Sequence, residues 1–447
     1  MTASSLDNTE FKNLLAPTGE ALTLSEHFQR FLQLPIFPML GLVCLFVATF
    51  LNLINLTLDK DKVAIDLQVM LKLAGLAACG IYGGLGFLSL PKVRQTIFTF
   101  PIMWMFLILG FYFLAVPFSL TPTESLASTI SIACVMLMTV TVLHHVGPQV
   151  VLNIVFAAMT LFVAFSWFVY FAVPEIGVFA EPIPGGEFQY RMSGLAHPNT
   201  LGQVSGLTVV VGFLLYFTYK QKWLLIVGTV LLALLALMFS LSRTSLFATV
   251  VAVAVVHRHK VFDRRKMIYG LWLGAAGLIG LMILSLSVDL EAFFLGKLSF
   301  VAKSGDAEEL TSATGRADIW GYTIRLISQR PLTGFGAATT KYHLAEYSSY
   351  THNLILNIAF SSGVLGGLAA LAMCLGRLFS LFRSHHAIAD ALVTFVLING
   401  LFENVIFSFL AGMPTVIWTM GLCLPAMEAQ QESTPGILNA SLKGRRQ

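Results

Sequence analysis

The sequence predicts an all-α polytopic membrane protein with about 12 transmembrane helices and a long, partly helical outer loop between helices nine and ten. Of its 447 residues, 56% are hydrophobic and only 11% are charged, whereas a soluble protein carries about 25% charged residues. Apolar runs of about 20 residues, long enough to cross a bilayer as a helix, recur along most of the chain. Alternating strands of about 10 residues, as in membrane barrels, are not found.

Hydropathy divides the chain into five parts. These are a cytoplasmic tail (1–35), spans one to nine (36–288), an outer loop (289–351), spans ten to twelve (352–428) and a second cytoplasmic tail (429–447). The individual spans are predicted at 36–56, 67–90, 98–118, 124–143, 150–173, 198–219, 222–240, 243–257, 267–288, 352–374, 387–409 and 411–428.

Basic residues in the short connections indicate the orientation. They occur in the connections at 92–94, 220–222, 258–266 and 377–383. An even number of predicted spans separates each of these connections from the next, so all four lie on the same face of the membrane. Lys and Arg accumulate on the cytoplasmic side of a membrane protein, so that face and both termini are predicted to be cytoplasmic. Net charge is only +4 without a basic block interleaved with aromatics, which argues against a nucleic-acid partner. The five cysteines lie within apolar runs at no metal-ligand spacing, so we expect packing roles, no bound metal and no cofactor.

The outer loop, residues 289–351, is the longest predicted connection. Loops of more than about 15 residues are uncommon and often functional. Of the ten histidines, only His197, His343 and His352 are predicted on the outer face. A general base acting on that face comes from these three, unless a carboxylate serves.

A helix is predicted at 315–328 within this loop, with Ser312 or Thr314 as its N-cap. Ile319, Trp320, Ile324 and Ile327 form its expected apolar stripe, and Arg316 shares that face. Arg316 therefore either pairs with an anion, which can be a phosphate at the first helical turn, or lays its stem on Trp320 with its head in water.

His352 and Asn353 begin the tenth span at the outer surface. A neutral imidazole suits proton abstraction from a sugar hydroxyl, and the alternative is a polar residue that only ends the loop. Glu403, in the eleventh span, is costly in an apolar helix unless paired, so it is expected to orient a histidine or bind an arginine.

Two further outer connections carry arginines. Arg191 precedes His197-Pro198-Asn199, where His197 and Asn199 suit helix capping and Arg191 suits a bidentate phosphate clamp. Arg243 lies in a tight link between two spans, either as a functional residue or as an interfacial cation.

Together these segments resemble the O-antigen ligase and polymerase superfamily of bacterial envelope enzymes. The likeness rests on their order: R-M-S-G-L-x-H-P-N-x-L-G at Arg191–Gly202, L-S-R-T-S at Leu241–Ser245, T-G-R-x-D-I-W at Thr314–Trp320, R-P-L-x-G-F-G at Arg330–Gly336, and H-N-L with a following G-x-x-G at His352–Gly366. It covers roughly residues 185–370, and residues 1–150 match only as generic spans.

The resemblance implies a GT-C-type glycosyltransferase of the bacterial inner membrane, with its active site on the periplasmic side. Such enzymes move a glycan as a block from undecaprenyl diphosphate to an acceptor hydroxyl, with inversion and without a metal. The family base corresponds to His352, and the diphosphate-binding arginines correspond to Arg191, Arg316 and, as a third, Arg243. Glu403, Asn353 and His197 are expected to support them.

Several alternatives remain. The acceptor is either another lipid-linked glycan, as in a polymerase, or the lipid A core, as in a ligase; the wording S-R-T-S and T-G-R-x-D-I-W favours the polymerase. A transporter or flippase of lipid-linked glycans also suits twelve spans, although the long loop and the lack of a visible repeat argue against it. A third class is a metal-dependent transferase built on Asp59 and Asp61.

Overall fold

The computed structural model describes residues 34–51, 54, 67–182, 188–220, 223–261, 316–383, 386–403, 406–407 and 410–432. The predicted ninth span, the first part of the outer loop, the Asp59–Asp61 pair and the predicted caps Ser312 and Thr314 lie outside these residues, as does nearly all of both predicted tails.

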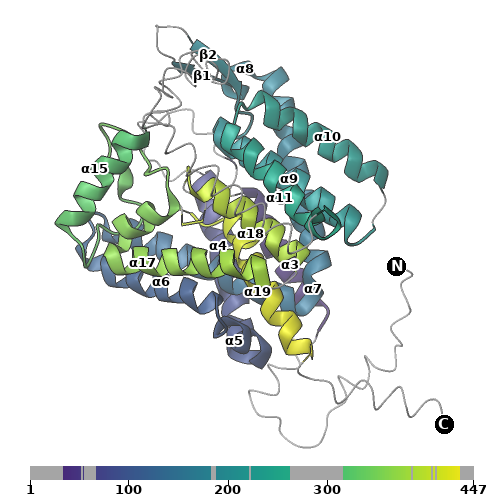
Figure 1. The fold of residues 1–447 in the computed structure, drawn as a ribbon, viewed down its shortest axis with the longest axis horizontal. Helices are drawn as coiled ribbons and strands as arrows, with labels where there is room; N and C mark the ends of the chain where they lie inside the picture. Colours follow the sequence, from purple (N-terminus) through teal and green to yellow (C-terminus); the bar gives the residue numbers. More distant parts are fainter. Residues whose placement is uncertain are drawn as a thin grey trace, which may run out of the picture.

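The described chain is predominantly helical, as predicted, and its long helices pack side by side (Figure 1). In order, the helices are α3 (Ile36–Phe50), α4 (Leu67–Ser89), α5 (Pro91–Ile97), α6 (Ile102–Ala115), the 3₁₀ turn η2 (Val116–Phe118), α7 (Pro122–Ala172), α8 (Pro174–Gly177), α9 (Pro198–Phe217), α10 (Trp223–Phe239), α11 (Arg243–Val261), α15 (Arg316–Gln329), α16 (Thr340–His343), α17 (Leu354–Arg383), α18 (Ala387–Gly400) and α19 (Met413–Glu432).

The helices follow the predicted spans closely. Helix α7 contains both the fourth and fifth, and it breaks between them at Gly147, where φ is 79° and Pro148 follows. By length and composition, four described helices can cross a membrane, namely α4, α7, α9 and α17. A fifth crossing is possible if α5 and α6, bent by 77°, make one span. Helices α3, α10, α11 and α18 are apolar but shorter, so the number twelve stays a prediction.

The connection at 174–197, predicted on the outer face, contains a small antiparallel hairpin that the sequence did not predict. Strand β1 (Val178–Pro182) pairs with β2 (Phe188–Met192), so that Phe179 faces Arg191 in the register. The hairpin lies at one end of the helical bundle, next to α8 (Figure 1). It holds Arg191 in regular backbone, beside the start of α9.

The described residues form two apolar cores. The larger runs through the long helices and includes the fully buried Trp418, Tyr82 and Phe395. The smaller core lies between α15 and the first part of α17, and it contains Leu326, Phe335, Leu344 and Phe360 among others. The described part of the outer loop is therefore packed onto the bundle by apolar contacts of its own.

Helix α15 begins and ends within one residue of the predicted helix. Its buried stripe differs from the prediction, because Ile324 is 55% exposed while Ile319, Thr323, Leu326 and Ile327 are buried. These four positions have the offsets i, i+4, i+7 and i+8, which is the spacing of one helical face. Trp320 lies at the edge of that face and donates its indole N–H to the carbonyl oxygen of Thr351, at 3.1 Å.

A backbone-to-backbone contact fixes the end of the loop. Helix α17 breaks at Gly363, with φ 82° and ψ 177°, and the Arg330–Gly336 motif lies against the break. The amide of Val364 donates to the carbonyl oxygen of Pro331 at 2.7 Å, and the amide of Gly336 donates to that of Ser361 at 2.9 Å. A Cβ on Gly363 would lie 2.6 Å from the Leu332 oxygen, so only glycine allows this approach.

Candidate active site

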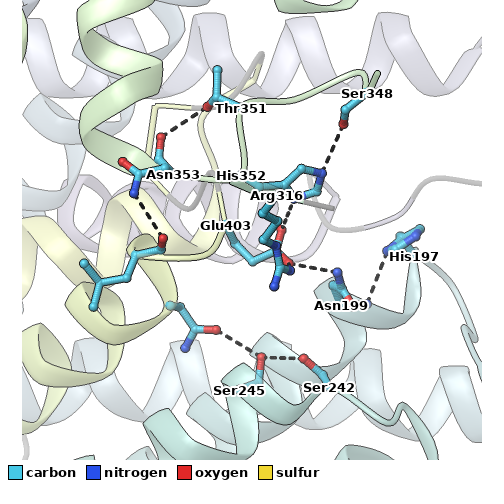
Figure 2. A network of polar contacts seen from close by, with 12 residues as sticks. His197, Asn199, Ser242, Ser245, Arg316, Ser348, Thr351, His352, Asn353 and Glu403 are labelled. Atoms are coloured by element: carbon cyan, nitrogen blue, oxygen red, sulfur yellow. Dashed lines mark hydrogen bonds and ion pairs between the residues drawn. The ribbon is translucent and has the colours of Figure 1, made fainter. Parts of the chain in front are cut away.

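His352 lies just before α17 and points into a polar cluster (Figure 2). Its φ is 49°, a left-handed conformation that costs a non-glycine residue roughly 1–2 kcal/mol. Asn353 begins the helix beside it: its side-chain oxygen accepts from the amide of Leu356 at 3.0 Å, and its side-chain nitrogen donates to the carbonyl oxygen of Leu401 at 3.1 Å. Asn353 therefore anchors the segment that presents His352.

Glu403 is the centre of the cluster. One carboxylate oxygen lies 3.1 Å from His352 Nδ1, and the other accepts from Arg316 at 2.9 Å and from the Asn199 side chain at 2.9 Å. The prediction that Glu403 lies within a span helix is wrong in detail, because α18 ends at Gly400. Leaving the helix allows the carboxylate to reach three partners from three separate elements, as Figure 2 shows.

The surroundings of Glu403 favour its charged form. Burial raises the pKa of its carboxyl, but the hydrogen bond from His352 and the charges of His352 and Arg316 outweigh this effect and lower the pKa below its ordinary value. Glu403 is therefore a carboxylate at neutral pH. A carboxylate can only accept hydrogen bonds, so His352 carries a proton on Nδ1 and donates it to Glu403.

Arg316 is the first residue of α15, and its side chain is 18% exposed. It pairs with Glu403 and lies over the ring of Phe402, with its guanidinium carbon 5.8 Å from the ring centre. The anionic partner expected for a cation on the buried helix face is therefore Glu403. This bond uses one terminal nitrogen of a guanidinium that carries five N–H donors.

Arg191 joins the same cluster through Asn199. Its side chain is 3% exposed and donates to Glu181 at 2.6 Å, to the carbonyl oxygen of Ser240 at 2.9 Å and to the Asn199 side-chain oxygen at 2.8 Å. The side-chain nitrogen of Asn199 in turn donates a hydrogen bond to Glu403. Three of the predicted residues, His352, Glu403 and Arg316, are therefore in direct contact, and Arg191 reaches them through one side chain.

His197 is the N-cap of α9, as its position before Pro198 predicted. Its Nδ1 accepts from the amide of Asn199 at 3.3 Å. Burial lowers the pKa of His197, and the charge of Arg191 lowers it further, so the ring stays neutral and can accept this bond.

Arg243 begins α11 and is half-buried. Beside it, the Ser242 hydroxyl donates to Ser245 at 3.0 Å, and Ser245 donates to the side-chain oxygen of Asn399 in α18 at 3.0 Å. These bonds fix the start of α11 against α18 near Glu403 (Figure 2).

Three contributors to the cluster were not predicted: Asn199, Glu181 and Ser348. Asn199 was interpreted as a cap, although its place in the H-P-N motif beside an outer arginine was the available signal. Glu181 comes from the unpredicted hairpin. Ser348 lies 3.1 Å from His352 Nε2, and no pattern in the sequence singles it out.

Residues 228–371 match the family model described as O-antigen ligase. The match runs from α10 into α17 and includes Arg243, Arg316 and His352, whereas Arg191 and Glu403 lie outside it. No curated protein and no solved structure matches the chain. This match confirms the resemblance to the O-antigen ligase and polymerase superfamily.

Proposed function

We propose that this protein is an inverting, metal-independent glycosyltransferase that moves a glycan as a block from undecaprenyl diphosphate to an acceptor hydroxyl at the periplasmic face. The observation that carries the proposal is the His352–Glu403–Arg316 cluster, which joins a base, a carboxylate and a cation within direct hydrogen-bond distance. Its members come from connections predicted on the outer face, and the family match supports glycan chemistry.

In the proposed reaction, His352 Nε2 takes the proton of the acceptor hydroxyl, while the Nδ1–H group keeps its hydrogen bond to Glu403. The acceptor oxygen forms a bond to the anomeric carbon from the side opposite the diphosphate. The bond between that carbon and the diphosphate oxygen breaks, and its electron pair leaves with undecaprenyl diphosphate. A single displacement of this kind inverts the anomeric configuration.

Arg316 is the proposed direct contact to the diphosphate. A guanidinium placed where negative charge develops stabilises the departing group, and arginine binds phosphate oxygens in a bidentate manner. Glu403 pairs with one terminal nitrogen of this guanidinium, and the other N–H groups of Arg316 can donate hydrogen bonds to phosphate oxygens.

Arg191 needs a refined role. Its buried guanidinium already holds Glu181, Ser240 and Asn199, so direct diphosphate binding requires that at least one of these bonds break. We therefore assign it to positioning Asn199 and, through it, Glu403. Arg243 remains the proposed second diphosphate contact, from its place at the start of α11.

For the acceptor we place another lipid-linked glycan first, which makes the enzyme a polymerase of O-antigen or exopolysaccharide. The motif wording S-R-T-S and T-G-R-x-D-I-W supports this choice. The second candidate is ligation to the lipid A core, which the description of the matching family favours. The proposed partners are the donor, the acceptor glycan and membrane lipid.

The deciding experiment offers both acceptors to the purified protein together with undecaprenyl-diphosphate repeat units. A polymerase produces a ladder of lengthened lipid-linked glycan on a gel, and a ligase adds sugar to the lipid A core. We expect His352→Ala to abolish either product, and full activity in that variant would contradict the assignment of the base.

Two outcomes favour the other classes. Loss of activity in a chelator, restored by added divalent metal, would favour a metal-dependent transferase built on Asp59 and Asp61, which lie outside the described residues. Movement of lipid-linked glycan across vesicles without a new glycosidic bond would favour a transporter.

A further inference from the structure

We propose that the segment Leu344–Thr351 forms the subsite for the acceptor sugar. In this assignment the Ser348 hydroxyl holds the place on His352 Nε2 that the acceptor hydroxyl takes, and the Tyr350 ring offers its face to the acceptor sugar ring. The proposal rests on the glycosyl transfer proposed above and adds the position and recognition of the acceptor.

The two ring nitrogens of His352 define two sides of the site. Nδ1 faces Glu403 and, beyond it, Arg316, whereas Nε2 faces Ser348 at 3.1 Å. Figure 2 shows Ser348 and Glu403 on opposite sides of the imidazole. When the ring is neutral with its proton on Nδ1, Nε2 carries the lone pair and accepts from the Ser348 hydroxyl. The only basic nitrogen of His352 is thus already bound to a hydroxyl group.

The surrounding structure fixes the Ser348 hydroxyl in this place. Its oxygen accepts from the amide of Tyr350 at 3.2 Å, which directs its proton to His352. The amide of Ser348 donates to the carbonyl oxygen of Leu344, a fully buried residue, at 2.8 Å. The Ser349 carbonyl accepts from the Thr340 hydroxyl at 3.0 Å, and that of Thr351 accepts from Trp320. Ser348 is therefore an ordered hydroxyl at the atom that takes the acceptor proton.

Exposed tyrosines flank this hydroxyl. The Tyr350 ring is 52% exposed and its centre lies 6.3 Å from that of His352. Tyr347 is 49% exposed and lies against Tyr322, with ring centres 4.9 Å apart. Tyrosine combines an apolar face with a polar hydroxyl, which suits contact with a ligand that also has both characters. A sugar ring has such faces, and a ring on Tyr350 can direct a hydroxyl to Nε2.

The reaction step keeps Ser348 chemically unchanged. The acceptor hydroxyl replaces that of Ser348 on Nε2, gives its proton to this nitrogen and bonds to the anomeric carbon, while the diphosphate leaves on the Arg316 side. Ser348 then acts as a placeholder that keeps the nitrogen covered between turnovers, and Tyr350 is a specificity-determining residue for the acceptor.

The test is steady-state kinetics in which donor and acceptor concentrations are varied separately. We expect Tyr350→Ala to raise the acceptor KM about tenfold, the size of one lost aromatic contact, while kcat and the donor KM stay within about twofold. Tyr350→Phe keeps the ring and should restore the acceptor KM. The matched control is Tyr190→Ala, because Tyr190 is also an exposed tyrosine (70%), on β2 outside the proposed subsite, and its loss should leave all constants unchanged.

Ser348→Ala distinguishes a placeholder from a proton relay. A placeholder predicts an acceptor kcat/KM at or above that of the wild type, since no reacting atom is lost. A fall in kcat would overturn the placeholder role. Equal changes in both KM values for Tyr350→Ala, or the same effect in Tyr190→Ala, would overturn the subsite and indicate an interfacial aromatic belt instead. If the wild type transfers no glycan to any acceptor, the proposed function itself fails, and this result differs from every outcome above.

Discussion

At the scale of single residues, His352 depends on side chains from other parts of the chain. Glu403, in the connection after α18, is hydrogen-bonded to Nδ1. Ser348, near the end of the outer loop, is hydrogen-bonded to Nε2. Asn199 and Arg316 hold Glu403 from the starts of α9 and α15. The imidazole thus has one orientation and one tautomer, and both depend on the charge of Glu403.

Glu403→Gln tests that dependence with little change of shape. The amide can turn its N–H₂ toward His352 and favour the wrong tautomer, and its neutral oxygen no longer forms an ion pair with Arg316. We expect kcat to fall by about 10²–10⁴-fold, the range that general base catalysis contributes, with thermal stability measured in parallel. The matched control is Glu428→Gln, because Glu428 pairs with His386 at 3.1 Å but is 63% exposed and lies in α19. An equal loss of activity in both variants would contradict a catalytic role for the Glu403 charge.

At the scale of elements, the arrangement of the site depends on how the outer loop is fastened to α17. The Arg330–Gly336 motif lies against the break at Gly363, and α15 covers the small core formed with Phe335 and Phe360. Both attachments lie within one short stretch of chain before His352. Loosening either attachment would therefore move His352, the proposed base, without altering any residue that contacts its imidazole.

Gly363→Ala tests the first attachment. Alanine would have to keep a φ of 82° and place its Cβ against the Leu332 oxygen, and the backbone strain alone costs about 1–3 kcal/mol. We expect a lower unfolding temperature in detergent and faster proteolysis between α15 and α17. Gly321→Ala is the control, since Gly321 lies within α15 with open space around it and alanine favours a helix by about 0.5–1 kcal/mol. Equal stability of the two variants would contradict the fastening role of the break.

His343 makes the second attachment sensitive to pH. Its ring lies edge-on to Phe335 at 4.5 Å and to Phe360 at 5.7 Å, and its Nε2 is buried with no hydrogen-bond partner among the described residues. Burial lowers the pKa of His343, and the charge of Arg330 lowers it further. The folded loop therefore binds fewer protons than the opened loop, where the pKa is about 6.5.

The sign of the effect follows from this difference. The packing of the loop is fully stable above about pH 6.5, and it weakens as the pH falls below this value toward the lowered pKa of the folded state. We expect proteolysis of the segment 330–353 to quicken between about pH 7 and pH 5.5. His343→Phe keeps an aromatic ring without a titrating group, so it should remove this dependence. An unchanged pH profile in His343→Phe would assign the effect to another group.

At the scale of the whole molecule, the sequence predicted the elements better than their connections. Apolar runs gave most helix bounds to within a few residues, since the requirement for about 20 apolar residues is strong. The hairpin at 178–192 and the end of α18 at Gly400 were missed, because both are set by contacts with distant residues. His352, Arg316 and Glu403 were singled out as candidates from residue type and position, and the structure brings them into contact, whereas Ser348 became visible only through its distance from Nε2.

The topology remains the broadest prediction. Arg191, Arg316, His352 and Glu403 meet at one place, as they must if their connections share one face. Cysteine labelling tests which face this is. The five natural cysteines are buried or half-buried, so an added exposed cysteine is a clear target for a membrane-impermeant thiol reagent.

We expect Tyr190→Cys, on the exposed side of β2, to be labelled in cells whose outer membrane has been opened while the inner membrane is intact. Lys220→Cys, exposed after α9 at the opposite end of that helix from His197, should be labelled only after the inner membrane is broken. Both positions are exposed, so a difference between them reflects the side of the membrane rather than burial. Labelling of Lys220→Cys alone in intact inner membranes would invert the topology and place the His352 cluster on the cytoplasmic side, where the proposed periplasmic transfer could not occur.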